Sequence, residues 1–234
     1  MRTIGSIGEE TAKSIRRCAV DLIAEHGFEA MSLRQLAERV GITTGALYNH
    51  IGGKQELLFG LLHAVMQDLL AAVDSQVLSH LDPLTQYQAF VQLHIQFHTD
   101  RKNDVLIATT ELRSLNSENY KKIIKLRNRY EATLSRILKH GCRTGIFSVT
   151  DTKLAVLALI PMLTGVSQWY RPGGRLSRNE LIERYLELSL VIAGASRKKS
   201  SLLVELPDID LEANARTADF GAKRRRFARS RDLR

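Results

Sequence analysis

Apolar side chains recur along this chain at intervals of three and four residues, which is the period of an α-helix with one buried face. Alternating runs typical of β-strands are scarce, and Gly, Pro, Asn and Asp residues separate the periodic segments. The pattern predicts nine helices, over about residues 8–26, 33–40, 44–50, 54–78, 83–100, 104–115, 117–141, 152–170 and 178–195. We therefore expect an all-α protein.

Residues that favour helix ends support several of these boundaries. Ser32 is expected to cap the helix over 33–40. Asp82-Pro83 combines an N-cap with proline at the first helical position. Ser177, followed by Glu180 three residues later, has the spacing of a capping box for the last helix.

The positive charge of the chain is concentrated at its C-terminal end. Of the formal net charge of +9, residues 197–234 supply +5, from eleven Lys and Arg against six Asp and Glu. Residues 1–54 hold seven basic and six acidic side chains, a net charge of only +1. Charge alone therefore does not locate a nucleic-acid-binding end, and we expect 197–234 to be a basic, poorly ordered tail.

Other functional classes find little support in the sequence. The apolar stretch at 154–170 is interrupted by polar residues and proline, so no membrane span is expected, and the N-terminus lacks the apolar core of a signal peptide. Cys18 and Cys142 lack metal-like spacing and predict no disulfide scaffold, which favours the cytoplasm. Gly52-Gly53-Lys54 lacks the remaining residues of a phosphate-binding loop. We expect neither an enzyme nor a bound cofactor or metal.

Residues 31–50 have the spacing of a helix-turn-helix. One set of side chains points inward from the two short helices, namely Leu33, Leu36, Ala37, Val40 and Leu47. Gly41 allows the positive φ of a tight turn, and Thr43 and Thr44 can cap the second helix. Gly45, Tyr48, Asn49 and His50 then face outward, on a helix that can lie in the DNA major groove. The alternative from the pattern alone is a helical hairpin that only packs.

The stretch from about residue 14 to 62 resembles the DNA-binding region of the TetR family. The resemblance implies a three-helix DNA-binding domain over 1–53 and a six-helix ligand-binding and dimerisation domain over 54–196. It also implies phosphate contacts by Tyr48 and Lys54. The full set of candidate DNA-binding residues is Ser32, Thr43, Thr44, Gly45, Tyr48, Asn49, His50 and Lys54. Ile51 stands where the family more often has an aromatic residue, which alters local packing but no expected DNA contact.

The resemblance further implies a homodimer that binds an inverted-repeat operator in double-stranded DNA and leaves it when a small ligand binds. The last two helices would form a four-helix interface with the partner chain. Their sequences agree, because 152–170 and 178–194 are apolar on more faces than one core requires. The alternative is that both helices lie at the centre of a single chain.

The segment 168–177 resembles, more loosely, the corresponding turn of TetR-type regulators of fatty-acid and steroid catabolism, whose effectors are acyl-CoA thioesters. On that basis Trp169 is a candidate for the pocket wall or the adjoining interface, and Arg113 for phosphate or dimer contacts. Trp169 could equally be a core aromatic residue beside an exposed turn. His94 and His98 share a helix face, and we expect them to be structural or to line the pocket rather than to bind zinc.

Two further expectations concern the ligand and the basic residues. The resemblance implies a small hydrophobic effector, with an acyl-CoA as the first class and an aromatic compound or drug as the alternative. A helical protein-interaction module without operator binding is the competing functional class. The basic run at 121–129 is typical of a solvated helix face.

Overall fold

The computed structural model describes residues 4–77 and 79–195. These residues form ten α-helices and one 3₁₀ turn and contain no β-strand, so the expected all-α class is confirmed. The predicted tail lies outside the described residues. The elements are α1 (Ile4–His26), α2 (Leu33–Val40), α3 (Thr44–Leu47), α4 (Lys54–Gln76), α5 (Pro83–Asp100), α6 (Lys102–Thr110), η1 (Leu112–Ser114), α7 (Ser117–Arg143), α8 (Thr152–Thr164), α9 (Val166–Trp169) and α10 (Arg178–Ile192).

Two of these elements replace the single helix expected over 152–170. Pro161 has no backbone N–H and so removes one hydrogen bond from the middle of this helix. The helix then ends at Thr164, and α9 starts immediately after Gly165. Counted together, α8 and α9 form one of the six helices expected after residue 53. The helix expected over 104–115 is likewise divided, into α6 and η1.

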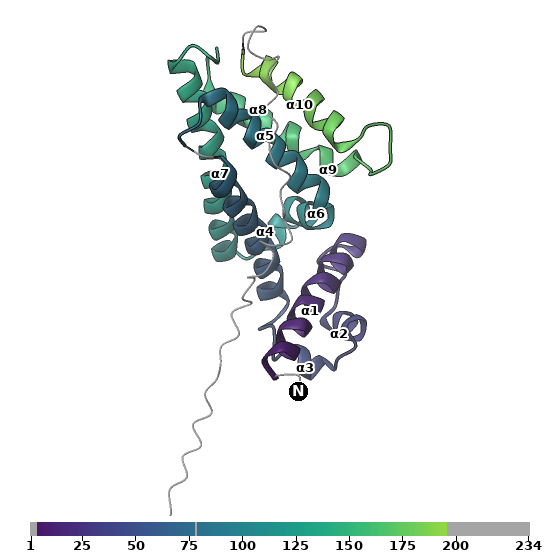
Figure 1. Ribbon diagram of the computed structural model, residues 1–234. Helices are drawn as coiled ribbons and strands as arrows, with labels where there is room; N and C mark the ends of the chain where they lie inside the picture. The colour runs from purple at the N-terminus through teal and green to yellow at the C-terminus, as the bar shows by residue number, and fades with distance from the viewer. Residues whose placement is uncertain (1–3, 78, 196–234) are drawn as a thin grey trace, which may run out of the picture.

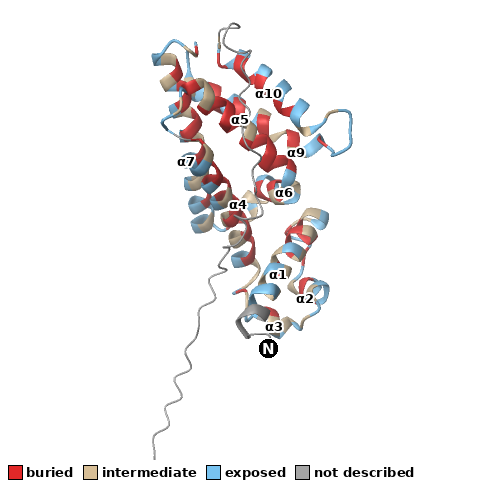
Figure 2. Cartoon of the chain, viewed as in Figure 1, coloured by how far each residue is buried: buried red, intermediate tan, exposed pale blue. Residues whose placement is uncertain are grey.

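Three helices form a small bundle at one end of the molecule, and α4 leads from it into the larger body (Figure 1). Within the body, α5 contacts α4, α6, α7, α8, α9 and α10, and most of its side chains are buried. Figure 2 shows the buried residues along the facing sides of these helices. Helix α6 touches both α4 and α1, so it joins the body to the small bundle.

The length and hydropathy of α4 would suit a membrane span, alone among the helices of the described residues. Its apolar window is mostly buried inside the protein, as expected of a central core helix.

Cys18 and Cys142 are both free thiols.

A close approach between α7 and the following loop yields a stability prediction. A Cβ atom at Gly141 would lie 2.0 Å from Cδ2 of Phe147, whose ring packs against Tyr87. Gly141→Ala should therefore lower the free energy of unfolding by about 1–3 kcal/mol through overpacking. Gly8→Ala is the matched control, because the exposed Gly8 in α1 has no atom within 4 Å of its Cβ position. Urea denaturation checks both, and an equally stable Gly141→Ala variant would contradict the packing argument.

Candidate nucleic-acid interface and ligand pocket

The two short helices α2 and α3 have the caps that a helix-turn-helix needs. The Ser32 hydroxyl accepts from the backbone N–H of Gln35, and the Gln35 side chain accepts in return from the Ser32 backbone. Gly41 ends α2 in the left-handed conformation, with φ of 79°. The Thr43 hydroxyl caps α3 by accepting from the N–H of Ala46 at 3.1 Å. These local interactions fix the angle between the two helices.

The turn of residues 48–50 that follows α3 presents an outward surface. The Tyr48 side chain is 55% exposed, although it follows the fully buried Leu47 directly. Asn49 is also exposed, while His50 is half-buried. Because α3 ends at Leu47, these three residues lie in the turn rather than in the longer helix expected over 44–50.

Lys54 and Ser32, two further candidate DNA-binding residues, already make hydrogen bonds within the protein. Lys54 donates a hydrogen bond from Nζ to the carbonyl oxygen of Glu29 at 2.9 Å, and its Nζ lies 4.6 Å from the centre of the Phe28 ring. An ammonium has three N–H donors, so two remain for a phosphate. The Ser32 hydroxyl donates to the side chain of Gln35 and would have to leave it to contact DNA. Thr44 is half-buried and Gly45 exposed, and Ile51 is buried in the core.

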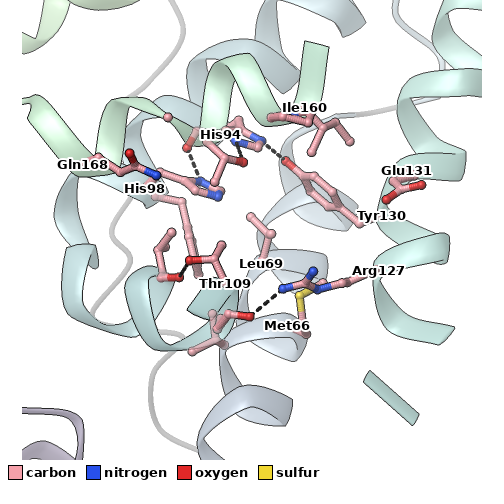
Figure 3. A pocket seen from close by; sticks show the side chains of 17 residues that line it. Met66, Leu69, His94, His98, Thr109, Arg127, Tyr130, Glu131, Ile160 and Gln168 are labelled. Atoms are coloured by element: carbon pink, nitrogen blue, oxygen red, sulfur yellow. Dashed lines mark hydrogen bonds between the residues drawn. The ribbon is translucent and has the colours of Figure 1, made fainter. Parts of the chain in front are cut away.

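A cavity of about 360 Å³ lies in the body among α4, α5, α6, α7, α8 and α9 (Figure 3). Its apolar wall includes Val65, Met66, Leu69, Phe97, Val105 and Ile160. Its polar wall includes His94, His98, Thr109, Arg127, Tyr130 and Gln168. Such a mixture, mostly apolar with a few polar groups, is typical of sites for small organic molecules.

Two stacked histidines form part of the polar wall. The rings of His94 and His98 are parallel, with centroids 3.8 Å apart. His94 is hydrogen-bonded through Nδ1 to the Tyr130 hydroxyl at 2.7 Å and through Nε2 to the Thr164 hydroxyl at 3.1 Å. Burial lowers the pKa of His94 well below its usual value, lowers the pKa of His98 to about 4, and raises the pKa of Tyr130. All three side chains are therefore neutral at neutral pH. Within the described ranges, no group of three His, Cys, Asp or Glu is placed to hold a metal ion.

The low pKa of His98 predicts a loss of stability in mild acid. Below about pH 6.5 the unfolded chain binds a proton at this residue, while the folded chain does not until about pH 4. The contribution of the neutral His98 to folding stability is therefore fully present above pH 6.5 and is lost as the pH falls toward 4. Between pH 7.5 and 5.5 the free energy of unfolding should fall by about 1 kcal/mol more in the wild type than in His98→Phe, whose side chain at this position cannot be protonated. Urea denaturation at both pH values measures this difference, and equal losses would contradict it.

Arg127 reaches the cavity from α7 together with Glu131, whose negative charge partly offsets that of the guanidinium. Its Nη2 donates to the carbonyl oxygen of Ala108 at 2.6 Å, and burial lowers its pKa. No carboxylate of the described residues forms an ion pair with it. The prediction of a solvated face over 121–129 is therefore wrong for this residue, because every third or fourth residue of α7 turns toward the body.

The two other candidate ligand-binding residues lie outside the lining of this cavity. The Trp169 side chain is 49% exposed and lies beside Tyr185 of α10, with ring centroids 6.3 Å apart. Arg113 is exposed on η1, next to residues that contact the small bundle. There, the Glu111 carboxylate accepts from the N–H of Phe28 at 3.3 Å. Sequence reasoning did not single out Tyr130 or Gln168, because their place in the cavity depends on contacts between distant segments.

Comparison with known proteins agrees with this geometry. Residues 15–61 match the family described as bacterial regulatory proteins, tetR family, and residues 80–193 match the tetracyclin repressor-like C-terminal domain. The solved structure of the TetR family transcriptional regulator PfmR from Thermus thermophilus is 32% identical, with a TM-score of 0.70. The match covers 76% of this chain and 97% of PfmR.

The chain belongs to the TetR family. As a member it is a DNA-binding transcriptional repressor of the cytoplasm and not an enzyme. The repressor KstR2 of Mycobacterium tuberculosis is 27% identical over 199 residues, which are 84% of this chain and 98% of KstR2. The structure of this ketosteroid transcriptional regulator has a TM-score of 0.73 at 24% identity, and the match covers 79% of this chain and 95% of KstR2.

A further structural neighbour of this TetR family repressor is AibR, solved in complex with isovaleryl coenzyme A and operator DNA. It has a TM-score of 0.72 at 22% identity, and the match covers 80% of this chain and all of AibR. At this identity the likeness concerns the fold alone.

Proposed function

We propose that this TetR family repressor is a homodimer, that it reads an inverted-repeat operator, and that a hydrophobic acyl-CoA thioester releases it. The observation that carries the proposal is the cavity of about 360 Å³, which is lined largely by apolar side chains and reached by Arg127. The proposal includes two domains. Residues 1–53 contact DNA, and residues 54–196 bind the ligand and the partner chain.

The DNA-contacting surface consists of α3 and the residues beside it. Tyr48 and Lys54 bind phosphates, while Asn49 and His50 lie near base edges in the major groove. Thr43, Thr44 and Gly45 approach the backbone at the start of α3, and Ser32 does so at the start of α2. Because the dimer is two-fold symmetric, it binds two half-sites about one to one and a half helical turns apart.

The dimer interface is the exposed apolar face of α8 and α10. Leu154 and Leu157 of α8 and Leu188 and Val191 of α10 are all more than half exposed. An apolar face of this kind on the last two long helices is best explained by burial against a second copy of the chain. Trp169 and Tyr185 lie beside this face and would extend the interface toward the mouth of the cavity.

The size of the cavity and the relatives together support an acyl thioester. A volume of about 360 Å³ is near the lower end of small-molecule sites, at about 300–1,000 Å³. The acyl group would fill it, and the nucleotide part would remain at its mouth. KstR2 is named for ketosteroid regulation and AibR was crystallised with isovaleryl coenzyme A. Arg127 offers N–H donors to the thioester carbonyl.

A partly buried ion-pair network offers the route from the cavity to the DNA-binding domain. Arg101 contacts Asp68 of α4 at 2.6 Å and Asp104 of α6 at 3.1 Å, and Arg16 of α1 contacts the same carboxylates at 3.8 and 3.4 Å. The cavity-lining residues Leu69 and Val105 each follow one of these carboxylates directly in sequence. A ligand that displaces them moves both carboxylates, and α1 and α4 tilt with them.

Replacing Arg16 should weaken the coupling between ligand and operator. Arg16→Met removes the one residue of this network that belongs to α1. The factor by which the ligand reduces operator affinity should therefore be several-fold smaller than in the wild type. This corresponds to a loss of about 0.5–2 kcal/mol of coupling free energy between the two sites. The neighbouring exposed Arg17→Met is the control. The ratio of operator affinities with and without ligand measures the coupling. An unchanged ratio in Arg16→Met would exclude the network as the route.

The proposed effector is tested by fluorescence anisotropy on DNA from upstream of the protein's own gene. Short-chain, long-chain and steroid-like acyl-CoAs are titrated, together with the matching free acids. We expect release by a thioester and not by its acid. Tight DNA binding that no thioester changes, with release by an aromatic compound or drug, would overturn the acyl-CoA class and leave the repressor.

A further inference from the structure

The His98 ring presents one nitrogen to the cavity, and its neighbours decide the chemistry of that nitrogen. The side chain is 6% exposed and lines the cavity from α5. Its Nδ1 lies 2.7 Å from the carbonyl oxygen of His94. A carbonyl oxygen only accepts hydrogen bonds, so Nδ1 carries the proton and donates. Burial keeps the ring neutral by lowering the pKa to about 4.

Because the ring is neutral and its proton is on Nδ1, Nε2 is a hydrogen-bond acceptor. This atom has no hydrogen-bond partner among the described residues. It is also not one of their fully buried polar atoms that lack a partner. It is therefore open to the cavity. The neighbouring His94 differs, because both of its ring nitrogens are already hydrogen-bonded to Tyr130 and Thr164.

We propose that the ligand of this cavity carries a hydroxyl group, which donates a hydrogen bond to Nε2 of His98. The inference deepens the proposed function and rests on the same cavity. In Figure 3 the His98 ring and the Arg127 guanidinium lie on different sides of Leu69. The cavity therefore offers an acceptor on one side and N–H donors on the other, with apolar walls between. This arrangement fits an apolar skeleton with a hydroxyl at one end and a carbonyl at the other.

A requirement for a hydrogen bond to Nε2 of His98 makes two related classes of ligand poor effectors. A saturated acyl chain would cover Nε2 and leave a buried acceptor without a partner. A ketone at the same position would place two acceptors against each other. Selection of an alcohol over its ketone follows from this geometry, since sites built to hydrogen-bond one group reject the analogue that lacks it.

The test uses 2-decalol and 2-decalone, two bicyclic probes that differ only in this oxygen, and measures their binding to the full chain by calorimetry. We expect the alcohol to bind the wild type about tenfold more tightly than the ketone. In His98→Phe the two affinities should become equal. In His98→Gln, whose amide both donates and accepts, both probes should bind. Circular dichroism checks that the variants are folded.

Equal affinities in the wild type, or a preference for the alcohol that survives in His98→Phe, would overturn the inference. If neither probe binds, dodecanoyl-CoA is compared with hydroxydodecanoyl-CoAs substituted at carbons 6 to 12, and the absence of any hydroxyl preference overturns it equally. The bicyclic probes contain no thioester, so the two proposals fail separately. Thioester release without a hydroxyl preference removes only the His98 inference, whereas an alcohol preference without thioester release removes only the acyl-CoA effector.

Discussion

Replacing Leu188 and Val191 of α10 with glutamate should convert the repressor into a monomer and weaken operator binding by about 100-fold or more. These side chains are 56% and 78% exposed in the single chain and form the centre of the proposed apolar face. In a dimer each substitution places two carboxylates in the apolar interface, one from each protomer. Burying unpaired charges is strongly unfavourable. A monomer also loses the second half-site, whose binding is intramolecular in the dimer.

Sedimentation and fluorescence anisotropy on the same samples measure both effects. Glu187→Gln is the control, because this exposed residue adjoins Leu188 and, among the described residues, forms an ion pair only with Arg184, at 3.3 Å. It changes the charge of α10 without touching the apolar face. A Leu188→Glu, Val191→Glu protein that remains dimeric would place the interface elsewhere.

The second large effect is expected at the turn that follows α3. Tyr48→Ala should lower operator affinity by about 100-fold or more while the dimer persists. Hydrogen bonds to charged groups contribute about 1.5–3 kcal/mol each, and the dimer loses two of them. Because the phenol is neutral, the salt dependence of binding should stay nearly unchanged.

Lys54→Ala provides a matched contrast, because this residue brings a charge to the same surface. Loss of one phosphate contact per half-site should reduce the slope of log K against log salt by about 2. Operator titrations at several salt concentrations distinguish the two variants. Unchanged operator binding in both would exclude the surface around α3 from DNA recognition.

Local signals were sufficient to predict α2 and the turn that follows it. The capping box of Ser32 and Gln35 and the left-handed Gly41 depend on residues within one turn of each other, so their spacing is visible in the sequence. The same holds for Ser177 and Glu180 at the start of α10. The interruption between α8 and α9 was missed, although Pro161 and Gly165 were both visible, because apolar periodicity continues across it.

The cavity could not be predicted in the same way. His94 meets Tyr130 and Thr164, which follow it by 36 and 70 residues, and only the packing of α5 against α7 and α8 brings them together. Arg127 belongs to the basic run at 121–129, and the sequence of that run does not indicate that this one side chain points into the cavity. Trp169 was a candidate because segment 168–177 resembles a turn of acyl-CoA-responsive regulators, yet its half-exposed position follows from where α9 ends.

The central claim is that ligand and operator bind at separate sites of one repressor and oppose each other. The most direct test is the affinity of the acyl-CoA that releases the operator in the anisotropy titrations, measured for the free protein and for the protein saturated with operator DNA. We predict that the operator weakens thioester binding about 10- to 100-fold, by the same factor with which the thioester weakens operator binding, because such coupling is reciprocal. Equal thioester affinity with and without operator would contradict the account, as would complete exclusion of a ternary complex, which would mean direct competition at the DNA surface.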